Sequence, residues 1–479
     1  MKKLFLAFVA IAIVSSSVQA KYSGGSGTAG DPYRIGSATD LLTLAGSTGD
    51  YDANFILTAD IDLAYYTFTA AVIAPDINIY VDGFQGTAFT GVFDGNGHKI
   101  TNLTISGSGY LGLFGTIEGP GSYWGYKDMV KNLTIENVNI TGSDPTASYN
   151  LGGLAGYNLY GAIKNCYSSG TITRANSDSG ADSFGGLIGY NDYGKINSCS
   201  SSVNIYGGRF AIDLGGLAGY NYYGNINNSF ATGDVSGEAL SLHEICEAFG
   251  GLVGRNEFGT INECWASGNV TSYGNLTEGA GGDEFGGLVG LNTWSTISNC
   301  YAIGSVTSNL MATGGLVGAN DSYSTITNCY STGSVLCTNT FYGGLVGDNL
   351  GTVTASFWDI NTSGLMFSDG GEGNTTAEMK TRSTFTNAGW DFVGETANGT
   401  EDIWRMCVND VNYPLLWWQF NKADFTCPDG VDFIDFAKLA EWWNHTDCAD
   451  NNDCDRTDMD LSGAVDIYDL KLFCNSWLE

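Results

Sequence analysis

The sequence predicts a mainly β protein: a right-handed parallel β-helix (solenoid) followed by a small α-helical calcium-binding C-terminal domain. Three observations lead to this prediction. A glycine-containing core recurs seven times, short β-branched segments alternate with Gly, Asn and Ser without a helical period, and an acidic loop near the C-terminus has EF-hand spacing. The 479 residues include 68 glycines and only 6 prolines, which indicates many tight turns.

Residues 1–20 have the pattern of a secretory signal peptide. Lys2 and Lys3 precede an apolar run, and Ala20 ends a small-residue cleavage site. We therefore expect a secreted protein, extracellular or at the cell surface, with no integral membrane segment in the mature chain. An uncleaved N-terminal anchor is the alternative, although the apolar run is short for a membrane span.

The charge balance excludes one class of partner. The chain has 19 Lys and Arg against 51 Asp and Glu, a formal net charge of −32. A chain this acidic repels phosphate backbones and anionic lipid surfaces. We therefore expect no nucleic acid partner.

Residues 21–150 are predicted to form an N-terminal cap and the first, irregular rungs. Ser37 and Asp40 form a capping-box pattern before an apolar run, so a short helix is expected to cover the open edge of the solenoid. Strand-like segments follow at 55–57, 92–93, 103–105 and 133–135.

Residues 151–358 contain the seven repeats, each predicted to be one rung of three short strands. An asparagine follows the first glycine of every copy by six positions, and these asparagines should stack along the axis in turns, bonding to one another. The copies begin at Gly152, Gly185, Gly215, Gly250, Gly286, Gly314 and Gly343, and the asparagines are Asn158, Asn191, Asn221, Asn256, Asn292, Asn320 and Asn349.

A cysteine column follows the asparagines. Ser229 and Ser356 fill the same position in two copies, which favours reduced thiols packed in the core over disulfides, because neither serine leaves an orphaned partner. The column consists of Cys166, Cys199, Cys264, Cys300 and Cys329.

Aromatic residues form two further sets. The first set would offer a stacking strip for sugar rings if it faces solvent; stacks that only stabilise neighbouring rungs are the favoured alternative. The first set is Tyr160, Tyr193, Tyr223, Phe258, Trp294 and Tyr323, and the second is Tyr167, Phe230, Trp265, Tyr301 and Tyr330.

The Gly-Gly-Leu-Val-Gly core, the asparagine and the following Asn-Cys-Tyr-Ser resemble the GLUG repeat of secreted bacterial surface proteins over residues 152–358. Residues 27–33 and 93–98 are similar to the solenoid segment that commonly precedes these repeats. The resemblance implies a fold rather than an activity, and many relatives are adhesin-like. Residues 359–422 are predicted as a C-terminal cap and linker, in which the tryptophan-rich stretch 390–418 closes the other edge.

Residues 423–479 carry the strongest chemical motif. The loop from Asp458 to Asp469 places side-chain oxygens at positions 1, 3, 5, 9 and 12 and glycine at position 6. Hard oxygen ligands in this order predict Ca²⁺. The predicted ligands of this loop are Asp458, Asp460, Ser462, Ala464 (backbone carbonyl), Asp466 and Asp469.

Asp at position 12, with one helix after the loop, resembles the dockerin module. A second copy lies 34 residues upstream, since 431–436 matches 465–470. Carrying the ligands back gives Asp424, Thr426, Asp432 and Asp435, although Pro428 and Asp429 depart from the pattern. The resemblance implies a cohesin-like protein partner or an extracellular scaffold.

The pairing of the late cysteines remains open in the sequence. Five cysteines (Cys407, Cys427, Cys448, Cys454 and Cys474) are expected to include a disulfide, but an odd number cannot all pair. A zinc site is not expected, because no CxxC or CxxH pair occurs.

The sequence favours a secreted, non-catalytic, adhesin-like or glycan-binding solenoid that the dockerin-like module tethers to its partner. The alternative is an extracellular polysaccharide hydrolase or lyase on the same fold. No catalytic residue is predicted, because Asp192, Glu257 and Asp321 are expected to be isolated and no nucleophile motif occurs. Three or more carboxylates converging on one rung face would favour the enzyme.

Overall fold

The computed structural model describes residues 21–81, 83–121, 125–143, 149–174, 182–209, 211–239, 247–274, 284–308, 310–337, 341–427, 430–448, 452–460 and 462–477. The predicted signal peptide at 1–20 lies outside these ranges. No helix among the described residues is long and apolar enough to cross a membrane.

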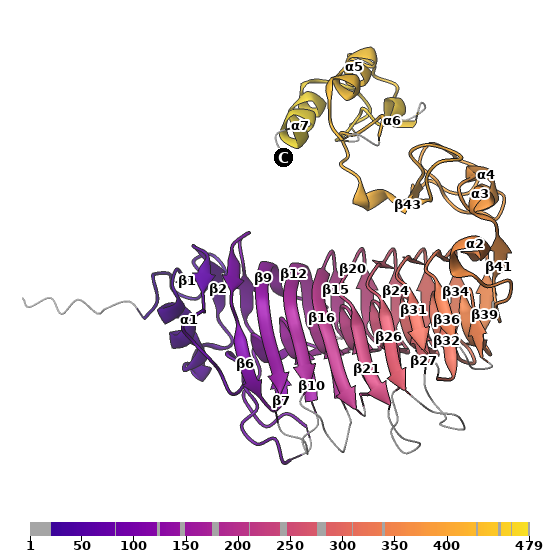
Figure 1. The fold of residues 1–479 in the computed structure, drawn as a ribbon. Helices are drawn as coiled ribbons and strands as arrows, with labels where there is room; N and C mark the ends of the chain where they lie inside the picture. Colours follow the sequence, from indigo (N-terminus) through magenta and orange to yellow (C-terminus); the bar gives the residue numbers. More distant parts are fainter. Residues whose placement is uncertain are drawn as a thin grey trace, which may run out of the picture.

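The chain forms a parallel β-solenoid in which the seven repeats stack as successive rungs (Figure 1). Corresponding residues pair from rung to rung; Asn158 is opposite Asn191, which is opposite Asn221. Every strand pair among the described residues is parallel except β42 (Trp404–Arg405) with β43 (Leu415–Leu416).

Two eight-stranded sheets carry the start of each repeat. Sheet 1 consists of β7 (Gly109–Leu111), β10 (Tyr149–Gly152), β13 (Asp182–Gly185), β17 (Asp213–Gly215), β22 (Phe249–Gly250), β27 (Glu284–Gly286), β32 (Ala312–Gly314) and β37 (Tyr342–Gly343). Sheet 2 consists of β8 (Phe114–Glu118), β11 (Ala155–Leu159), β14 (Ile188–Asp192), β18 (Ala218–Tyr222), β23 (Val253–Glu257), β28 (Val289–Thr293), β33 (Val317–Asn320) and β38 (Val346–Asn349).

The glycine that ends each sheet 1 strand of the seven repeats allows a tight corner between the two sheets. A Cβ placed on Gly215 would lie 1.9 Å from the carbonyl oxygen of Ala218 in sheet 2. Any side chain there would force the two strands apart. The repeated Gly-Gly dipeptide is therefore a packing requirement of this corner.

Sheet 3 contains the remaining 25 strands. Its N-terminal members are β1 (Tyr33–Ile35), β2 (Asn54–Leu57), β3 (Ile61–Asp62), β4 (Val92–Asp94), β5 (Lys99–Thr101), β6 (Thr104–Gly107) and β9 (Asp128–Gly142). Its repeat members are β12 (Ala162–Arg174), β15 (Lys195–Asn197), β16 (Ser200–Arg209), β19 (Asn225–Asn227), β20 (Phe230–Ala231), β21 (Val235–Ala239), β24 (Thr260–Asn262), β25 (Trp265–Ala266), β26 (Val270–Gly274), β29 (Thr296–Ser298), β30 (Tyr301–Ala302), β31 (Val306–Ser308), β34 (Thr325–Thr327), β35 (Tyr330–Ser331), β36 (Val335–Cys337), β39 (Thr352–Thr354), β40 (Phe357–Asp359) and β41 (Glu372–Asn374).

The prediction of three strands per rung is wrong for the central rungs, which have five. The rung that starts at Asp213 is divided into β17, β18, β19, β20 and β21. In the central rungs a strand of sheet 3 ends before the cysteine column, where the preceding residue has a left-handed backbone, as at Asn228 (φ 46°) and Asn299 (φ 51°); β12 instead continues through the same position, Asn165 (φ 51°). Each break turns the chain and divides one predicted strand.

The core runs the length of the solenoid between the sheets. Leucines after the Gly-Gly pair and isoleucines at the start of sheet 3 are fully buried in successive rungs, as at Leu217 and Ile226. Each such side chain contributes about 1.5–3 kcal/mol when removed from water. The cysteine column lies in this same core.

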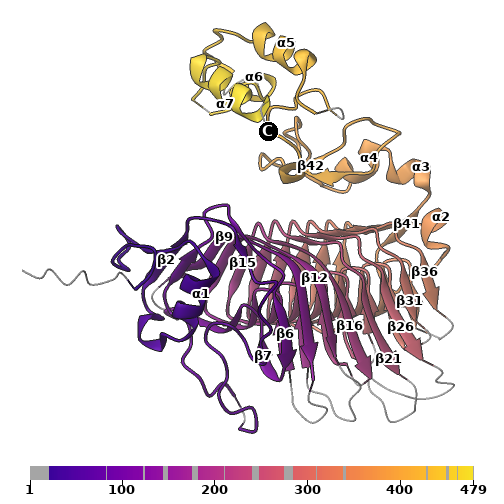
Figure 2. The ribbon, with the colours of Figure 1, turned by 60° about the vertical axis from the view of Figure 1, so that its left-hand side comes forward.

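The N-terminal edge is covered as the sequence predicts. Helix α1 (Ala38–Ala45) begins after Ser37, whose side chain accepts a hydrogen bond from the Asp40 amide. Its Leu41 and Leu44 are completely buried, and a short 3₁₀ helix, η1 (Thr48–Asp50), follows. The helix therefore covers the apolar edge of the first rung (Figure 2).

The C-terminal edge is closed by different residues from those predicted. Residues 364–374 cover it: Ser368 Oγ accepts hydrogen bonds from the amides of Leu345 and Val346, and β41 pairs with β40. Helix α2 (Ile360–Ser363) leads into this segment. An edge strand needs backbone partners, which an extended segment provides and bulky tryptophans cannot.

The tryptophan-rich segment instead packs on the side of the solenoid. This flank segment (residues 375–422) contains α3 (Thr376–Met379), α4 (Arg382–Thr386), β42, β43 and η3 (Trp417–Gln419). Trp390 and Trp404 are fully buried against Tyr301, Tyr330 and Phe357. The second aromatic set is therefore partly covered by the chain itself.

The C-terminal module has its own small core. It contains α5 (Phe433–Glu441), α6 (Asn452–Asp455) and α7 (Ile467–Trp477), packed around Leu439, Val465 and Phe473 (Figure 1). Two disulfides join Cys407 to Cys427 and Cys448 to Cys454, while Cys474 is free and exposed. The first of these links the module to the flank segment.

Candidate functional site

Three carboxylates of the second predicted loop converge on one point. Among the described residues, Asp458, Asp460 and Asp469 form the one group of at least three His, Cys, Asp or Glu side chains able to hold a metal ion. Their ligand atoms lie within 4.8 Å of one another. Gly463, at loop position 6, has φ 90°, and Val465 is buried and anchors the loop, as expected.

Backbone amides fix this geometry. Asp469 Oδ1 accepts hydrogen bonds from the amides of Met459 and Asp460, and its Oδ2 accepts one from the Asp466 amide. Asp458 accepts from the amides of Ser462 and Gly463. The loop is therefore ordered around its carboxylates by hydrogen bonds within the protein.

The donor set fits Ca²⁺. Burial, together with the neighbouring Asp469 carboxylate, raises the pKa of Asp458, as expected where like charges are close. All three ligands are hard oxygens, which Ca²⁺ prefers. Asp466 caps α7, because its Oδ1 accepts a hydrogen bond from the Tyr468 amide. The two other predicted ligands bond to each other, since Ser462 Oγ donates to the Ala464 carbonyl.

The first loop has a related arrangement with a different electrostatic environment. Asp435 is fully buried and accepts from the amide and hydroxyl of Thr426 and from the amide of Asp432, as Asp469 does in the second loop. Asp424 Oδ1, however, lies 4.0 Å from Arg405 Nη2. Pro428 and Asp429, where the pattern departs, lie outside the described residues.

The first aromatic set forms one continuous stack along the axis. Ring centroids of successive members, Tyr160, Tyr193, Tyr223, Phe258, Trp294 and Tyr323, are 5.1, 4.7, 4.6, 6.0 and 4.3 Å apart. All six have a left-handed backbone, an unfavourable conformation for bulky residues, which the stacking offsets. Tyr223, Trp294 and Tyr323 are exposed to solvent.

Stacking occupies most of the ring faces in this set. Tyr193 and Tyr223 are nearly parallel, with 3° between their planes, so each covers a face of the other. Tyr323 ends the stack and is 76% exposed, which leaves one of its faces open. Between its ends the stack presents ring edges to solvent.

Sequence reasoning missed an acidic cluster at the corner between sheets 1 and 2. Asp213 and Glu284 both precede the first glycine of their repeats by two positions, so the pairing register places them in one column, with Ala248 between them. Alignment of the repeats at this position could have revealed the column. Two strand steps separate their backbones by about 10 Å.

An arginine lies at the centre of this cluster. Arg255 donates to Asp213 Oδ1 at 2.9 Å and to Glu247 Oε2 at 2.6 Å. Burial raises the pKa of Asp213 to about 6 despite this arginine, and burial raises the pKa of Glu284 to about 7. Glu284 Oε2 is buried and makes no hydrogen bond to protein.

The acids Asp192 and Glu257, expected to be isolated from other carboxylates, have tyrosine partners. Each accepts a hydrogen bond from a tyrosine of the preceding rung, Asp192 from Tyr157 and Glu257 from Tyr220. Asp321 instead bonds the Ser322 amide within its own turn. Stacking at a fixed spacing brings side chains together that are more than 30 residues apart in sequence.

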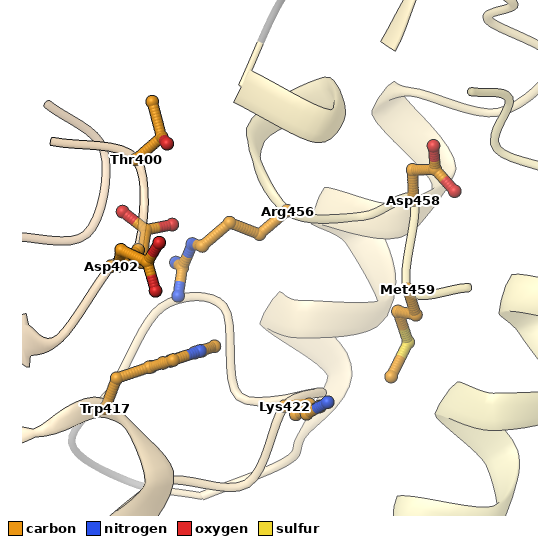
Figure 3. A pocket seen from close by; sticks show the side chains of 8 residues that line it. Thr400, Asp402, Trp417, Lys422, Arg456, Asp458 and Met459 are labelled. Carbon is orange, nitrogen blue, oxygen red and sulfur yellow. The ribbon is translucent and has the colours of Figure 1, made fainter. Parts of the chain in front are cut away.

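Two pockets lie where the flank segment meets the C-terminal module, and Arg456 lines both. The first, of about 240 Å³, is lined by Glu401, Asp402, Trp417 and Asp458 (Figure 3). In Figure 3 the Arg456 side chain extends toward Asp402. Lys422 also lines this pocket, which therefore has both acidic and basic side chains, and it adjoins the second loop.

The repeats contain the GLUG motif: the family described as the GLUG motif matches residues 147–173, 211–236, 281–307 and 309–336. Over 171 residues the chain is 34% identical to halomucin of Haloquadratum walsbyi, covering 34% of this chain and 2% of halomucin. Over 163 residues it is 35% identical to a protein of Evansella cellulosilytica described as a Gly-rich membrane protein, covering 33% of this chain and 17% of that protein. The chain thus spans a small part of these relatives.

Two solved structures are similar to the chain. A Bacteroides ovatus protein described as an immunoglobulin A1 protease aligns with a TM-score of 0.44 at 19% identity, covering 83% of this chain and 96% of that one. A second, described as IgA1 protease, aligns with a TM-score of 0.37 at 16% identity, covering 67% of this chain and 21% of that one.

Proposed function

We propose that this chain is a secreted, non-catalytic, adhesin-like solenoid, attached to an extracellular partner by a calcium-dependent, dockerin-like module. The observation that carries this proposal is the convergence of Asp458, Asp460 and Asp469 within 4.8 Å. Bound Ca²⁺ would neutralise these carboxylates and couple metal binding to the folding of the module. The solenoid would then present a long, rigid surface beyond the point of attachment.

Repeated exposed apolar residues support a protein partner for the module. Phe433 and Ile434 precede Asp435 in the first loop, as Ile467 and Tyr468 precede Asp469 in the second. Their exposed fractions are 78%, 58%, 61% and 64% in that order. Exposed apolar side chains at duplicated positions are typical of a docking surface. We infer that a cohesin-like module contacts them.

Calorimetric titration of CaCl₂ into the metal-stripped full-length chain tests the metal site. Asp458→Asn with Asp469→Asn should abolish the high-affinity phase, because both amides lack the charge that Ca²⁺ requires. Glu441→Gln, at the exposed end of α5, should bind like the wild type. Absence of calcium binding by the wild-type chain would overturn the proposal.

Attachment is tested on cells that secrete the chain. We expect EGTA to release the wild-type protein from the cell surface. Phe433→Asp with Ile467→Asp should fail to attach while still binding calcium. Attachment that persists in EGTA would contradict calcium-dependent docking.

The glycan-binding part of the proposal rests on Tyr323, the aromatic with an open ring face. Tyr323→Ala should weaken binding to a polysaccharide that the wild type binds. Loss of one stacking surface should reduce the binding free energy by about 1–3 kcal/mol, which would shorten retention on that polysaccharide. Tyr193→Ala is the matched control, because neighbouring rings cover Tyr193. Equal retention of both variants would exclude stacking on this set.

The acidic cluster favours a second candidate function, cleavage of a polysaccharide. Glu284, with a pKa of about 7, could donate a proton to a leaving oxygen while ionised Asp213 acts as base. Reducing-sugar release that is lost in Glu284→Gln and in Asp213→Asn but kept in Glu372→Gln would establish this activity. No release from a polysaccharide panel would exclude it.

A further inference from the structure

The second pocket at the junction of flank segment and module is basic. It encloses about 290 Å³, and three arginines, Arg382, Arg405 and Arg456, line it together with Thr426 and the Cys407–Cys427 disulfide. The chain has seven arginines in all: Arg34, Arg174, Arg209, Arg255, Arg382, Arg405 and Arg456. In a protein of net charge −32, three of seven arginines in one pocket is a marked concentration.

Two of these guanidinium groups have buried nitrogens without a partner in the protein. Arg405 is 6% exposed, and its Nη1 makes no hydrogen bond; the same is true of Arg456 Nη1. Leaving a buried charged donor unpaired is energetically unfavourable. An acceptor entering the pocket would recover this free energy.

Several carboxylates lie near the three arginines of the pocket. Asp455 is the one acidic residue of the lining, and it is ion-paired with Lys438. Asp424 faces Arg405 from outside the lining at 4.0 Å. Asp402 and Asp435 also interact electrostatically with Arg456, so the feature that an anion would use is the pair of unpartnered Nη1 atoms on Arg405 and Arg456.

The arginines are held in place before any ligand arrives. Arg382 Nη2 donates to the Val393 carbonyl at 2.9 Å, and Arg456 Nη2 donates to the Phe425 carbonyl. Arg405 lies over the rings of Trp417 and Phe420, at 5.2 and 4.7 Å from their centroids. Preorganised guanidinium groups bind carboxylate and sulfate groups well, because their planar forks match these acceptors.

The geometry points to an oxyanion-binding pocket at this junction, which takes the carboxylate or sulfate group of an acidic sugar. A volume of about 290 Å³ accommodates one such sugar unit. Arg405 and Arg456 would bind the anionic group. Arg382 would form another part of the pocket wall. The pocket adjoins the first predicted calcium loop through Thr426, but its lining contains neither the three carboxylates of the second loop nor the exposed apolar residues on which the docking proposal rests.

Titration of the calcium-saturated full-length chain with sodium sulfate and sodium glucuronate, against NaCl at matched ionic strength, tests this inference. We expect binding of at least one of the two anions, and the preferred anion identifies the group. Arg382→Gln and Arg405→Gln should each weaken binding at least tenfold. Arg34→Gln, a distant and exposed arginine, should bind like the wild type.

The Asp458→Asn, Asp469→Asn variant should keep its anion affinity, which separates this test from that of the calcium site. If Arg405→Gln does not fold, the half-buried Arg382→Gln decides the outcome. Heats no larger than those with NaCl, or equal affinity in Arg382→Gln and Arg34→Gln, would overturn the inference.

Discussion

The backbone amide of Cys199 donates a hydrogen bond to Ser229 Oγ at 3.1 Å, in the place where the Cys166 amide meets Cys199 Sγ at 3.4 Å. Serine and cysteine are therefore equivalent in adjacent rungs, because each small side chain accepts a hydrogen bond from a backbone amide of the preceding rung. The column is a repeated backbone contact, and all five of its cysteines are buried and free.

We predict that alkylation of the native protein leaves the five column cysteines unmodified and modifies exposed Cys474. Burial raises the pKa of Cys166 and Cys300 well above the usual thiol value, so no reactive thiolate forms. Mass spectrometry after denaturation without reductant should show all five modified. Modification only after reduction would mean that the column is bridged.

An Asn→Ala substitution inside the asparagine column should destabilise the protein more than one at the end of the column. Asn221 accepts from Asn191 Nδ2 at 2.7 Å and donates to Asn256 Oδ1 at 2.8 Å. Asn221→Ala removes one hydrogen bond from each buried neighbour, leaving Asn256 Oδ1 without its donor, and should lower the free energy of unfolding by about 2–5 kcal/mol. Asn349→Ala removes one hydrogen bond at the end of the column. Urea denaturation should show that it lowers the free energy of unfolding by less than half as much as Asn221→Ala does.

Glu284 should make stability depend on pH. Between pH 4.5 and 7 the folded chain keeps the Glu284 proton that the unfolded chain has released, so the free energy of unfolding falls as pH rises, by about 3 kcal/mol in total, and levels off above pH 7. Asp213, whose pKa is raised to about 6, adds a slope of the same sign at lower pH, so Glu284→Gln should flatten the profile mainly between pH 6 and 7, whereas exposed Glu372→Gln should leave it unchanged. Parallel pH profiles of wild type and Glu284→Gln would show that Glu284 titrates normally.

The packing of the flank segment against the solenoid should depend on its buried tryptophans. Trp390 packs on Tyr330 and Phe357, and its Nε1 donates to the Ala355 carbonyl at 2.8 Å. Trp390→Ala should cost about 3–5 kcal/mol and expose residues 375–422 to limited proteolysis, while the solenoid stays intact. Unchanged proteolysis would indicate that other contacts hold the segment.

The sequence by itself determined the solenoid and its columns. A side chain at a fixed repeat position must lie above its counterpart, so the register of the asparagines, cysteines and aromatics follows from spacing alone. The convergence of Asp458, Asp460 and Asp469 was predictable for a similar reason, because the three lie within twelve consecutive residues. Local spacing is visible in a sequence.

Only the tertiary structure decided which surfaces meet. The flank segment covers Tyr301 and Tyr330 on the side of the solenoid, and no periodicity in the sequence specifies where a non-repetitive segment packs. Arg382, Arg405 and Arg456 come from three separate segments and meet at one pocket only because the flank segment and the module pack together. Such contacts depend on the shape and burial of whole surfaces, which residue spacing does not encode.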